Sequence, residues 1–449
     1  MPIDLGLSRV TKLLRHLGNP HINTYKSIHI AGTNGKGSTV AYLSSILTQA
    51  KVRNGRFTSP HMVYYNDSIC INNEVYPLAK FKSISDYVQK ENTSLRLGCT
   101  EFELLTVTAF KIFELERVEL AIIEVGLGGR LDATNVLESF IDDRTTGHKG
   151  GVIATGITKI GIDHEALLGD TLAAIAYEKA GIMKKSVSCV VDRQNDQEAL
   201  DVLKKVAKDT MSDLYIVDGI SEAETYPTDK SCCSDDVKSL VEYSPLKGDY
   251  QLQNLSIALK ILDVIKLQNH SSLNDENGES KLTTDSIKLG IKKTVWPGRL
   301  QSINIPKSGL RLLLDGAHNE SAAIELAKYI ERIRNDGSGI IFVIALTKGK
   351  SIDNLLKHVI HKNDTIIPTV FSIPDQMPWV SSYSCEDVQK VAKNYVEDVR
   401  NISASGQSIE QVLDYVNELK LSGDNRNVVV CGSLYLCADI LRYVDTVSK

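Results

Sequence analysis

Residues 28–39 (IHIAGTNGKGST) combine an apolar run, a glycine-rich turn and one lysine, and a helical pattern follows over Val40–Ala50. The backbone amides of such a turn and the positive end of the following helix attract anions, while a lysine supplies a mobile charge to the outer phosphates. The spacing departs from the standard G-x4-G-K-[ST] pattern, because Ile30 stands in place of the first glycine and Gly37 directly follows Lys36. A chance cluster of glycines is the alternative, but the order of the parts favours a phosphate-binding loop.

A carboxylate, Glu124, ends the apolar run LAIIE over residues 120–124. Ligands of parallel sheets bind at the carboxyl ends of the strands. Mg2+ prefers oxygen ligands and shares them with phosphates. Glu124 is therefore a candidate metal ligand, and a glutamate that only faces solvent is the alternative.

Three further side chains carry weaker signals. His164 follows Asp163 after the apolar run that ends near Ile157, and a lone histidine is more often structural than a ligand. Ser59 offers a hydroxyl to a metal, although its Thr-Ser-Pro-His context favours a turn. Lys179 lies on a helical stretch, where most lysines are solvated.

Another group of polar residues follows a later apolar run. Asp315 closes that run and is followed by His318 and Asn319 before a helical pattern begins. An aspartate in this place is suited to a ribose hydroxyl or a phosphate-linked network, and helix capping is an equal alternative for Asp315 and Asn319.

The composition is that of an ordinary soluble globular protein. The chain has 449 residues, 42% of them hydrophobic and 24% charged, with a formal net charge of −5. The length predicts two or three domains, and the mild acidity gives no electrostatic footprint for nucleic acid. No window approaches the roughly 18 uninterrupted apolar residues of a membrane span, and no secretory signal stands near Met1. We expect a cytoplasmic protein that does not bind membranes.

The N-terminal segment and the cysteines fit this expectation. Arg9, Lys12 and Arg15 on a helical pattern imitate a mitochondrial presequence, but Asp4 and the scarcity of serine favour a docked first helix. A pool of the protein in mitochondria is kept as an alternative. Eight cysteines lie without C-x2-C pairs or metal-ligand spacing, which predicts buried or idle thiols in a reducing compartment.

From Ile28 to about Val295, short apolar runs alternate with helical patterns. Residues 120–124 and 151–157 are apolar enough for strands buried on both faces, which implies a mostly parallel sheet with helices on both faces. Two polar stretches, 138–150 and 268–281, are expected to be surface insertions that bury almost nothing.

The alternation restarts after residues 296–299 (WPGR), and the Pro-Gly pair favours a bend there. We therefore expect a first domain over 1–298 and a second, smaller α/β domain over 299–449. Its expected strands and helices are 312–315 with 321–330, 340–346 with 352–359, and 428–431 with 434–443.

Eight motifs in the same order resemble the folylpolyglutamate synthase and dihydrofolate synthase family of the Mur ligase superfamily. They are AGTNGKGS (31–38), TSPH (58–61), EVGLGGRLDATN (124–135), DHEALLG (163–169), EKAGI (178–182), YQLQN (250–254), WPGR (296–299) and DGAHN (315–319). The segments DLGLSRV (4–10), CTEFELLTVTAF (99–110) and CGSLYLCADILR (431–442) resemble the fungal dihydrofolate synthases in particular.

The resemblance implies a P-loop-type domain followed by a smaller Rossmann-like domain, with site residues as follows. It implies ATP-binding roles for Gly32, Thr33, Asn34, Gly35, Lys36, Gly37, Ser38, Asn254, Arg299, Asp315 and His318. It implies Mg2+ ligation by Ser59, Glu124 and His164, and pteroate contacts by Thr100, Phe102, Glu103, Leu131, Asp132 and Ala133. Lys36, Lys179 and His164 are its catalytic candidates, with Lys179 matching a lysine that the family carbamylates.

The activity that the resemblance implies is ATP-dependent ligation of L-glutamate to 7,8-dihydropteroate through an acyl phosphate. The sequence leaves a folylpolyglutamate synthase acting on tetrahydrofolate as an alternative, and a nucleotide-binding regulatory ATPase as an alternative of another class. We expect a monomer whose partners are small molecules, and a monovalent cation as a candidate cofactor beside Mg2+.

Overall fold

The computed structural model describes residues 6–140, 149–217, 236–268, 270–306, 308–334, 338–402 and 408–448. Asp4, Cys232, Cys233 and most of the expected insertion 138–150 lie outside the described residues. The chain forms two compact units. Unit 1 comprises residues 1–61, 66–245 and 250–295, and unit 2 comprises 62–65, 246–249 and 296–449.

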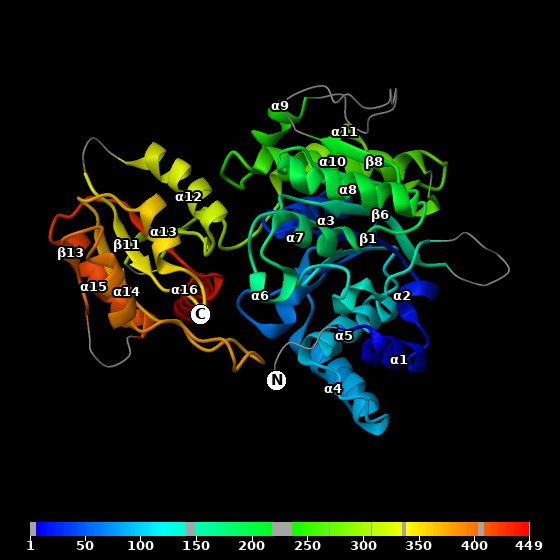
Figure 1. Cartoon of the computed structure of the whole chain (residues 1–449), viewed down its shortest axis with the longest axis horizontal. Helices are drawn as coiled ribbons and strands as arrows, with labels where there is room; N and C mark the ends of the chain where they lie inside the picture. The colour runs from blue at the N-terminus through cyan, green and yellow to red at the C-terminus, as the bar shows by residue number, and fades with distance from the viewer. Residues whose placement is uncertain are drawn as a thin grey trace. The chain divides into compact units, whose positions relative to one another are not determined.

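Unit 1 is built on a sheet with the strand order β4-β3-β2-β5-β1-β6-β7-β8 (Figure 1). Its strands are β1 (Lys26–Ala31), β2 (Asn54–Phe57), β3 (Ile69–Ile71), β4 (Glu74–Val75), β5 (Leu120–Glu124), β6 (Gly151–Ile157), β7 (Cys189–Asp192) and β8 (Leu214–Val217). Its α-helices are α1 (Ser8–His16), α2 (Pro20–Asn23), α3 (Lys36–Gln49), α4 (Leu78–Ser94), α5 (Glu101–Leu115), α6 (Glu165–Leu168), α7 (Leu172–Ala180), α8 (Gln197–Thr210), α9 (Val237–Val241), α10 (Gln251–Leu267) and α11 (Thr284–Lys292). Short 3-10 helices are η2 (Ala133–Val136) and η3 (Ser271–Leu273).

The sheet of unit 1 is parallel from β2 to β8, and at one edge β3 pairs antiparallel with both β2 and β4. The central strands β1, β5 and β6 are buried almost throughout, as the apolar runs 120–124 and 151–157 predict for β5 and β6. The predicted mostly parallel α/β sheet is confirmed. Its β1, β5 and β6 place the chain segments that follow them at one edge of the sheet.

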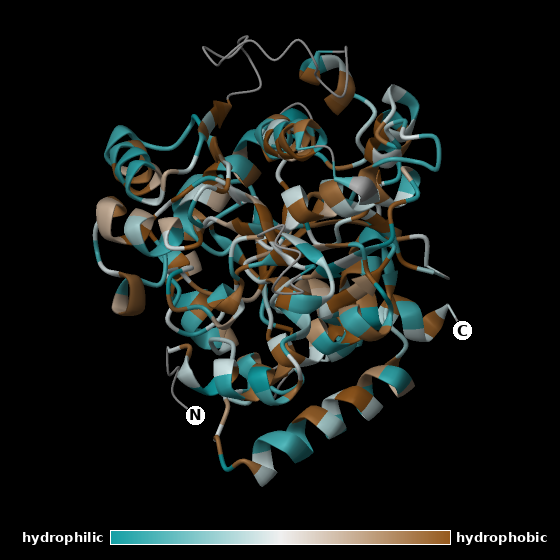
Figure 2. Cartoon of the chain, turned by 90° about the vertical axis from the view of Figure 1, so that its right-hand side faces the viewer, coloured by the Kyte–Doolittle hydropathy of each residue, from teal (hydrophilic) through white to brown (hydrophobic). Residues whose placement is uncertain are grey.

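Helices cover both faces of this sheet. Ala31 and Ile157 pack with α7 and α8, whereas their neighbours Ile30 and Gly156 face the opposite side, where Gly156 lies against Ile257 of α10. Helices α10 and α11 both pack on α3. The helices carry hydrophilic and hydrophobic residues on different sides, as helices that cover a sheet do (Figure 2).

The N-terminal segment forms a docked helix, as predicted. Val10, Leu13 and Leu14 of α1 are fully buried, and α1 packs on α5. The expectation that 268–281 buries almost nothing is wrong in part, because Leu273 is only 1% exposed. Its single leucine is enough to anchor the stretch on unit 1.

Unit 2 has a second mixed sheet with the order β13-β12-β11-β14-β10-β9, parallel except for β9 against β10. Its elements are β9 (Gln301–Asn304), β10 (Arg311–Leu314), α12 (Glu320–Ile333), β11 (Ile341–Ile344), α13 (Ile352–Val359), β12 (Thr365–Pro368), α14 (Cys385–Ala392), β13 (Asp398–Val399), α15 (Ile409–Leu421), β14 (Val428–Cys431) and α16 (Leu434–Val447). One face of the sheet packs on α15 and α16 in a continuous apolar core. A second α/β unit is thus present, with its own core.

The cysteines of the described ranges agree with the sequence. Six of them are free and buried, as expected of idle thiols. No helix within the described part of the chain is long and apolar enough to span a bilayer.

Candidate active site

The loop between β1 and α3 has a backbone that only glycine allows at two positions. Gly32 has a φ of 145° and Gly35 a φ of 93°. A Cβ atom at Gly32 would lie 1.9 Å from Thr158 Oγ1, and one at Gly35 would lie 2.2 Å from Asn254 Oδ1. The loop is therefore fixed against both the end of β6 and the start of α10.

The amides of this loop divide into two sets. Thr33 and Asn34 donate their backbone N–H groups to the Lys159 carbonyl at 2.8 and 3.1 Å. The first bond of α3 runs from Thr39 N to Gly35 O at 3.0 Å, so the amides of the preceding first turn have no intrahelical acceptor. That first turn, residues 36–38, is the part of the loop suited to an anion.

Two lysines converge on the loop from different helices. Lys36 Nζ donates to the carbonyls of Gly32 at 3.1 Å and Thr33 at 3.3 Å, and Lys179 Nζ donates to Gly32 at 2.9 Å. Lys36 Nζ also lies 3.9 Å from Glu124 Oε1. Lys36, Lys179 and Glu124, which the sequence places on three separate segments, thus meet at one point of the loop.

Lys179 is buried in α7, with 4% of its surface exposed, so the default of a solvated lysine does not hold. Burial and the nearby charge of Lys36 lower the pKa of Lys179 from 10.5 to about 7, against the opposing effect of Asp163 and Asp132. About half of the Lys179 amines are therefore neutral near pH 7, and a neutral amine is a nucleophile.

The three expected metal ligands sit in different settings. Glu124 ends β5 and is 5% exposed. Ser59 Oγ is buried, and no described residue is its hydrogen-bond partner. The His164 side chain is half exposed, and its backbone is in the left-handed region. Its Nε2 atom lies 3.9 Å from Asp163 Oδ2. Within the described ranges no three His, Cys, Asp or Glu side chains gather as a metal site.

A buried amide pair of α10 supports the start of α3. Gln251 is fully buried, and its Nε2 lies 3.4 Å from Ser38 Oγ. Asn254 Nδ2 donates to Gln251 Oε1 at 3.1 Å, and Thr39 Oγ1 donates to Asn254 O at 3.4 Å. Sequence reasoning named Asn254 but missed Gln251, although both stand in the motif YQLQN.

Asp132 holds the segment that follows β5. Its carboxylate accepts from Leu127 N at 2.8 Å and Thr134 N at 3.0 Å, and burial raises its pKa. Beside it, Leu131 is half-buried and Ala133 is buried at the start of η2. The backbone of this segment is thus fixed by a side chain that the resemblance assigns to substrate.

Thr100 and Glu103 form a capping box at the start of α5. Thr100 N donates to Glu103 Oε2 at 2.7 Å, and Glu103 N donates to Thr100 Oγ1 at 3.3 Å. Arg9 of α1 donates to both carboxylate oxygens of Glu103, at 3.1 and 3.3 Å. Arg9 is a second residue that sequence reasoning missed.

Phe102 stands in the first turn of the same helix. Its ring stacks on that of Phe57 with the centroids 6.1 Å apart and the planes 21° apart, and it lies against Gly126. Phe102 is half-buried, so part of an aromatic face remains available beside the segment after β5.

The candidate residues of unit 2 cluster at the end of β10. Asp315 is buried and accepts from Leu300 N and Ala317 N, both at 2.9 Å. Burial raises the pKa of Asp315, and the charge of Arg299 opposes that effect. His318 Nδ1 lies 2.9 Å from Gly316 O, and Asn319 caps α12 by accepting from Ala322 N at 2.9 Å. Asn319 is thus a helix cap, as the alternative reading of the sequence predicts. Asp315 instead holds the turn that follows β10.

Comparisons with known proteins agree on one family. The family model "Dihydrofolate synthetase, C-terminal domain" matches residues 299–443. Dihydrofolate synthetase of Saccharomyces cerevisiae is 38% identical and covers 98% of both chains. Dihydrofolate synthase/folylpolyglutamate synthase of Bacillus subtilis is 30% identical over 97% of this chain and 94% of that one.

A solved structure has the same fold. Mycobacterium tuberculosis folylpolyglutamate synthase, complexed with ADP and AMPPCP, superimposes with a TM-score of 0.77 at 23% identity, over 98% of this chain and 95% of that one. This likeness shows the fold. The sequence relatives are named as synthetases and synthases, which argues against the alternative of an unrelated regulatory ATPase. The chain belongs to the folylpolyglutamate synthase and dihydrofolate synthase family of ATP-dependent ligases.

Proposed function

We propose that this protein is a dihydrofolate synthase, which uses ATP to join L-glutamate to 7,8-dihydropteroate and releases dihydrofolate, ADP and phosphate. The observation that carries the proposal is the meeting of Lys36, Lys179 and Glu124 at the Gly32 loop. The choice of acceptor rests on the full-length similarity to the yeast enzyme.

The first chemical step activates a carboxylate. An oxygen of the pteroate carboxylate attacks the γ-phosphorus of ATP, ADP leaves, and an acyl phosphate forms. Lys36 leaves the carbonyls of Gly32 and Thr33 for the phosphates and, with the first-turn amides of α3, stabilises the negative charge spread over the phosphoryl oxygens. The unprotonated amine of glutamate then attacks the acyl carbon, phosphate leaves, and the amine loses a proton.

Ser59, Glu124 and His164 are the proposed Mg2+ ligands. The buried Ser59 hydroxyl without a described partner and the strand-end carboxylate of Glu124 are oxygen donors that suit this ion, whereas His164 would add an imidazole nitrogen. When bound there, Mg2+ neutralises part of the charge on the phosphates. Lys36 and the first-turn amides of α3 would act on the same phosphates.

Lys179 is proposed to carry a carbamate. Its neutral amine attacks the carbon of CO2, and the nitrogen loses a proton, which leaves a carbamate anion. This converts a buried cation beside Lys36 into an anion able to support Lys36 or a metal ligand. With 13C-labelled bicarbonate, a carbamate resonance is expected in the wild type and its absence in Lys179→Met; equal spectra would refute the modification.

The pteroate ring is proposed to bind beside the Phe102 ring, Leu131 and Ala133. Thr100, Glu103 and Asp132 then contribute mainly by holding the backbone that surrounds this site. Their side chains already bond to the start of α5 and to the segment after β5. Aromatic stacking suits a flat pterin.

Arg299, Asp315 and His318 are proposed to contact the nucleotide from unit 2. In that unit Asp315 holds the turn beside Arg299 through two backbone amides. Gly32, Thr33, Asn34, Gly35, Gly37, Ser38 and Asn254 form the proposed nucleotide site of unit 1 with Lys36. For the two functional domains we keep the proposed ranges 1–298 and 299–449.

The remaining properties are proposals with simple tests. We propose a cytoplasmic monomer, to be tested by light scattering after gel filtration and by cell fractionation, which also detects a mitochondrial pool. A monovalent cation is retained as a candidate cofactor, to be tested by replacing K+ with tetramethylammonium in the assay.

The experiment that tests the function is acceptor-dependent incorporation of labelled glutamate. The protein is incubated with ATP, labelled L-glutamate and either 7,8-dihydropteroate or tetrahydrofolate. Product with dihydropteroate alone is expected. Product with tetrahydrofolate alone would establish the folylpolyglutamate synthase alternative, and product with both would match the double name of the Bacillus subtilis relative.

A further inference from the structure

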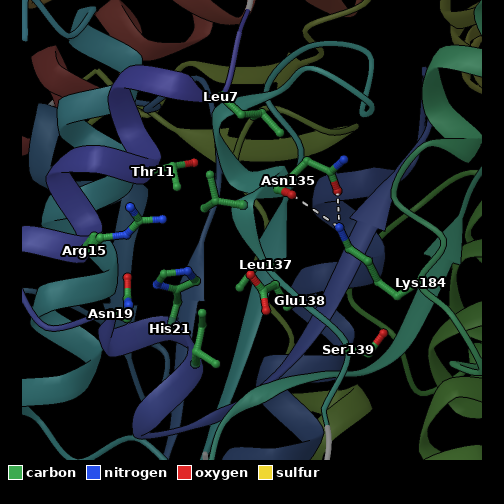
Figure 3. A pocket seen from close by; sticks show the side chains of 12 residues that line it. Leu7, Thr11, Arg15, Asn19, His21, Asn135, Leu137, Glu138, Ser139 and Lys184 are labelled. Atoms are coloured by element: carbon green, nitrogen blue, oxygen red, sulfur yellow. Dashed lines mark hydrogen bonds between the residues drawn. The ribbon is translucent and has the colours of Figure 1, made fainter.

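A pocket in unit 1 is lined by none of the residues proposed for catalysis. Helices α1 and α2 form one wall, and residues 135–139 with Lys184 form the other (Figure 3). The cavity volume is about 520 Å3, which lies within the range of small-molecule sites. None of its lining residues belongs to the proposed nucleotide, metal or pteroate sites.

Two cations reach this pocket from opposite walls. Arg15 extends from α1, and no acceptor or acidic partner for its guanidinium exists among the described residues. Among the described residues, Lys184 Nζ donates only to uncharged oxygens, Asn135 Oδ1 at 2.7 Å and Asn135 O at 3.3 Å (Figure 3). Burial lowers the pKa of Lys184 to about 8, with Glu138 opposing, so the amine stays mostly protonated at pH 7.

One carboxylate, the exposed Glu138, lines the pocket against these two cations. The lining therefore carries a net positive charge. Arg15 in particular keeps five N–H donors in a planar fork that matches a carboxylate or a phosphate.

His21 supplies a buried hydrogen-bonding atom in the same wall. The residue is 3% exposed, and its Nδ1 has no hydrogen-bond partner among the residues described. The ring stacks on Phe110, and burial lowers its pKa to about 4, so it is neutral at physiological pH. Buried polar atoms in folded proteins normally have a partner, and here a bound molecule in the pocket would supply it.

We propose that this pocket binds a small metabolite that carries an oxyanion, a carboxylate or a phosphate, together with a hydrogen-bonding group. The oxyanion lies between Arg15 and Lys184, and the hydrogen-bonding group meets His21 Nδ1. The side chains of Thr11 and Asn19 add a hydroxyl and an amide to the same wall.

The pocket shares one structural segment with the proposed pteroate site. Asp132 caps the start of η2, whereas Asn135 at its far side accepts from Lys184 and donates to Gly181 O at 3.0 Å. The two sites are thus separate but are connected through four consecutive residues of backbone.

The test is a calorimetric titration of the full chain, with the nucleotide loop saturated by Mg2+ and AMPPCP so that added anions do not bind there. Succinate and inorganic phosphate are the two probes. Saturable binding of at least one is expected, and the probe that binds identifies a carboxylate or a phosphate as the recognised group.

Three variants assign the binding to the pocket. Arg15→Glu and Lys184→Gln are each expected to weaken it at least tenfold, while Lys12→Glu on the exposed side of α1 is the matched control and leaves it unchanged. Arg15 is exposed, so Arg15→Glu keeps the fold, which circular dichroism verifies. Failure of both probes to bind, or wild-type affinity in Arg15→Glu, would overturn the proposal.

Discussion

The amine of Lys179 donates to the carbonyl oxygen of Gly32 at 2.9 Å, so a buried lysine of α7 touches the loop between β1 and α3. The same carbonyl accepts from Lys36 at 3.1 Å. Burial, and next the nearby charge of Lys36, lower the pKa of Lys179. The loop thus brings two lysine amines together, with Glu124 3.9 Å from Lys36.

The first prediction concerns stability against pH in CO2-free buffer. The pKa of Lys179 is 10.5 unfolded and about 7 folded, so between these values the unfolded chain binds the additional proton and stability rises with pH. From pH 7 to 8.5 the free energy of unfolding of the wild type should rise by about 1.5 kcal/mol more than that of Lys179→Met. Urea unfolding at each pH measures this difference. Parallel pH profiles for the two proteins would show that Lys179 has an ordinary pKa.

Lys36→Ala is expected to reduce turnover by at least about 10²-fold, because it removes the mobile charge that stabilises the phosphoryl oxygens. Its circular dichroism spectrum should stay that of the wild type. Lys90→Ala, which removes an exposed lysine of α4, is the matched control. Near-normal turnover in Lys36→Ala would remove the phosphate-binding role of this lysine.

Gly35→Ala should raise the KM for ATP by about tenfold or more, because the added Cβ would lie 2.2 Å from Asn254 Oδ1 at a positive φ. Gly98→Ala is the control, since Gly98 has a φ of 66° with no atom within 4 Å of an added Cβ. That control should lose about 1 kcal/mol of stability and keep the KM for ATP. An equal rise of KM in both variants would indicate a general effect of strain.

Arg9→Gln should raise the KM for the pteroate more than it lowers kcat, because Arg9 fixes Glu103 and hence the first turn that carries Phe102. The loss of the partner of a buried carboxylate should also cost about 1–3 kcal/mol of stability. Arg9→Lys should restore part of the KM, and Lys12→Gln on the same helix should behave as wild type. A fall in kcat with the KM unchanged would argue against a positioning role.

The sequence predicted the buried strands and several helices of the second unit well. Residues 120–124, 151–157 and 428–431 are strands with those limits, and 352–359 is a helix, because their apolar runs are unbroken or follow the helical period. The short antiparallel strands β3, β4 and β9 went unpredicted. β4 and β9 lie at sheet edges and have few apolar residues, whereas β3 is apolar but only three residues long.

The candidate site was only partly predictable, because depth and loop contacts depend on tertiary structure. The spacing around Lys179 does not show that its helix lies in the core with its amine on Gly32. Nor does the loop motif show that Lys159, after β6, accepts the amides of Thr33 and Asn34. Periodicity reports which face of an element is apolar, but not which backbone groups meet across a sheet.

The most direct measurement of the central claim is a crystal structure of the protein with AMPPCP and Mg2+. The account predicts the β- and γ-phosphates on the amides of residues 36–38, with Lys36 Nζ moved from the Gly32 carbonyl to a phosphate oxygen. A triphosphate bound elsewhere, with Lys36 still donating to Gly32, would contradict it.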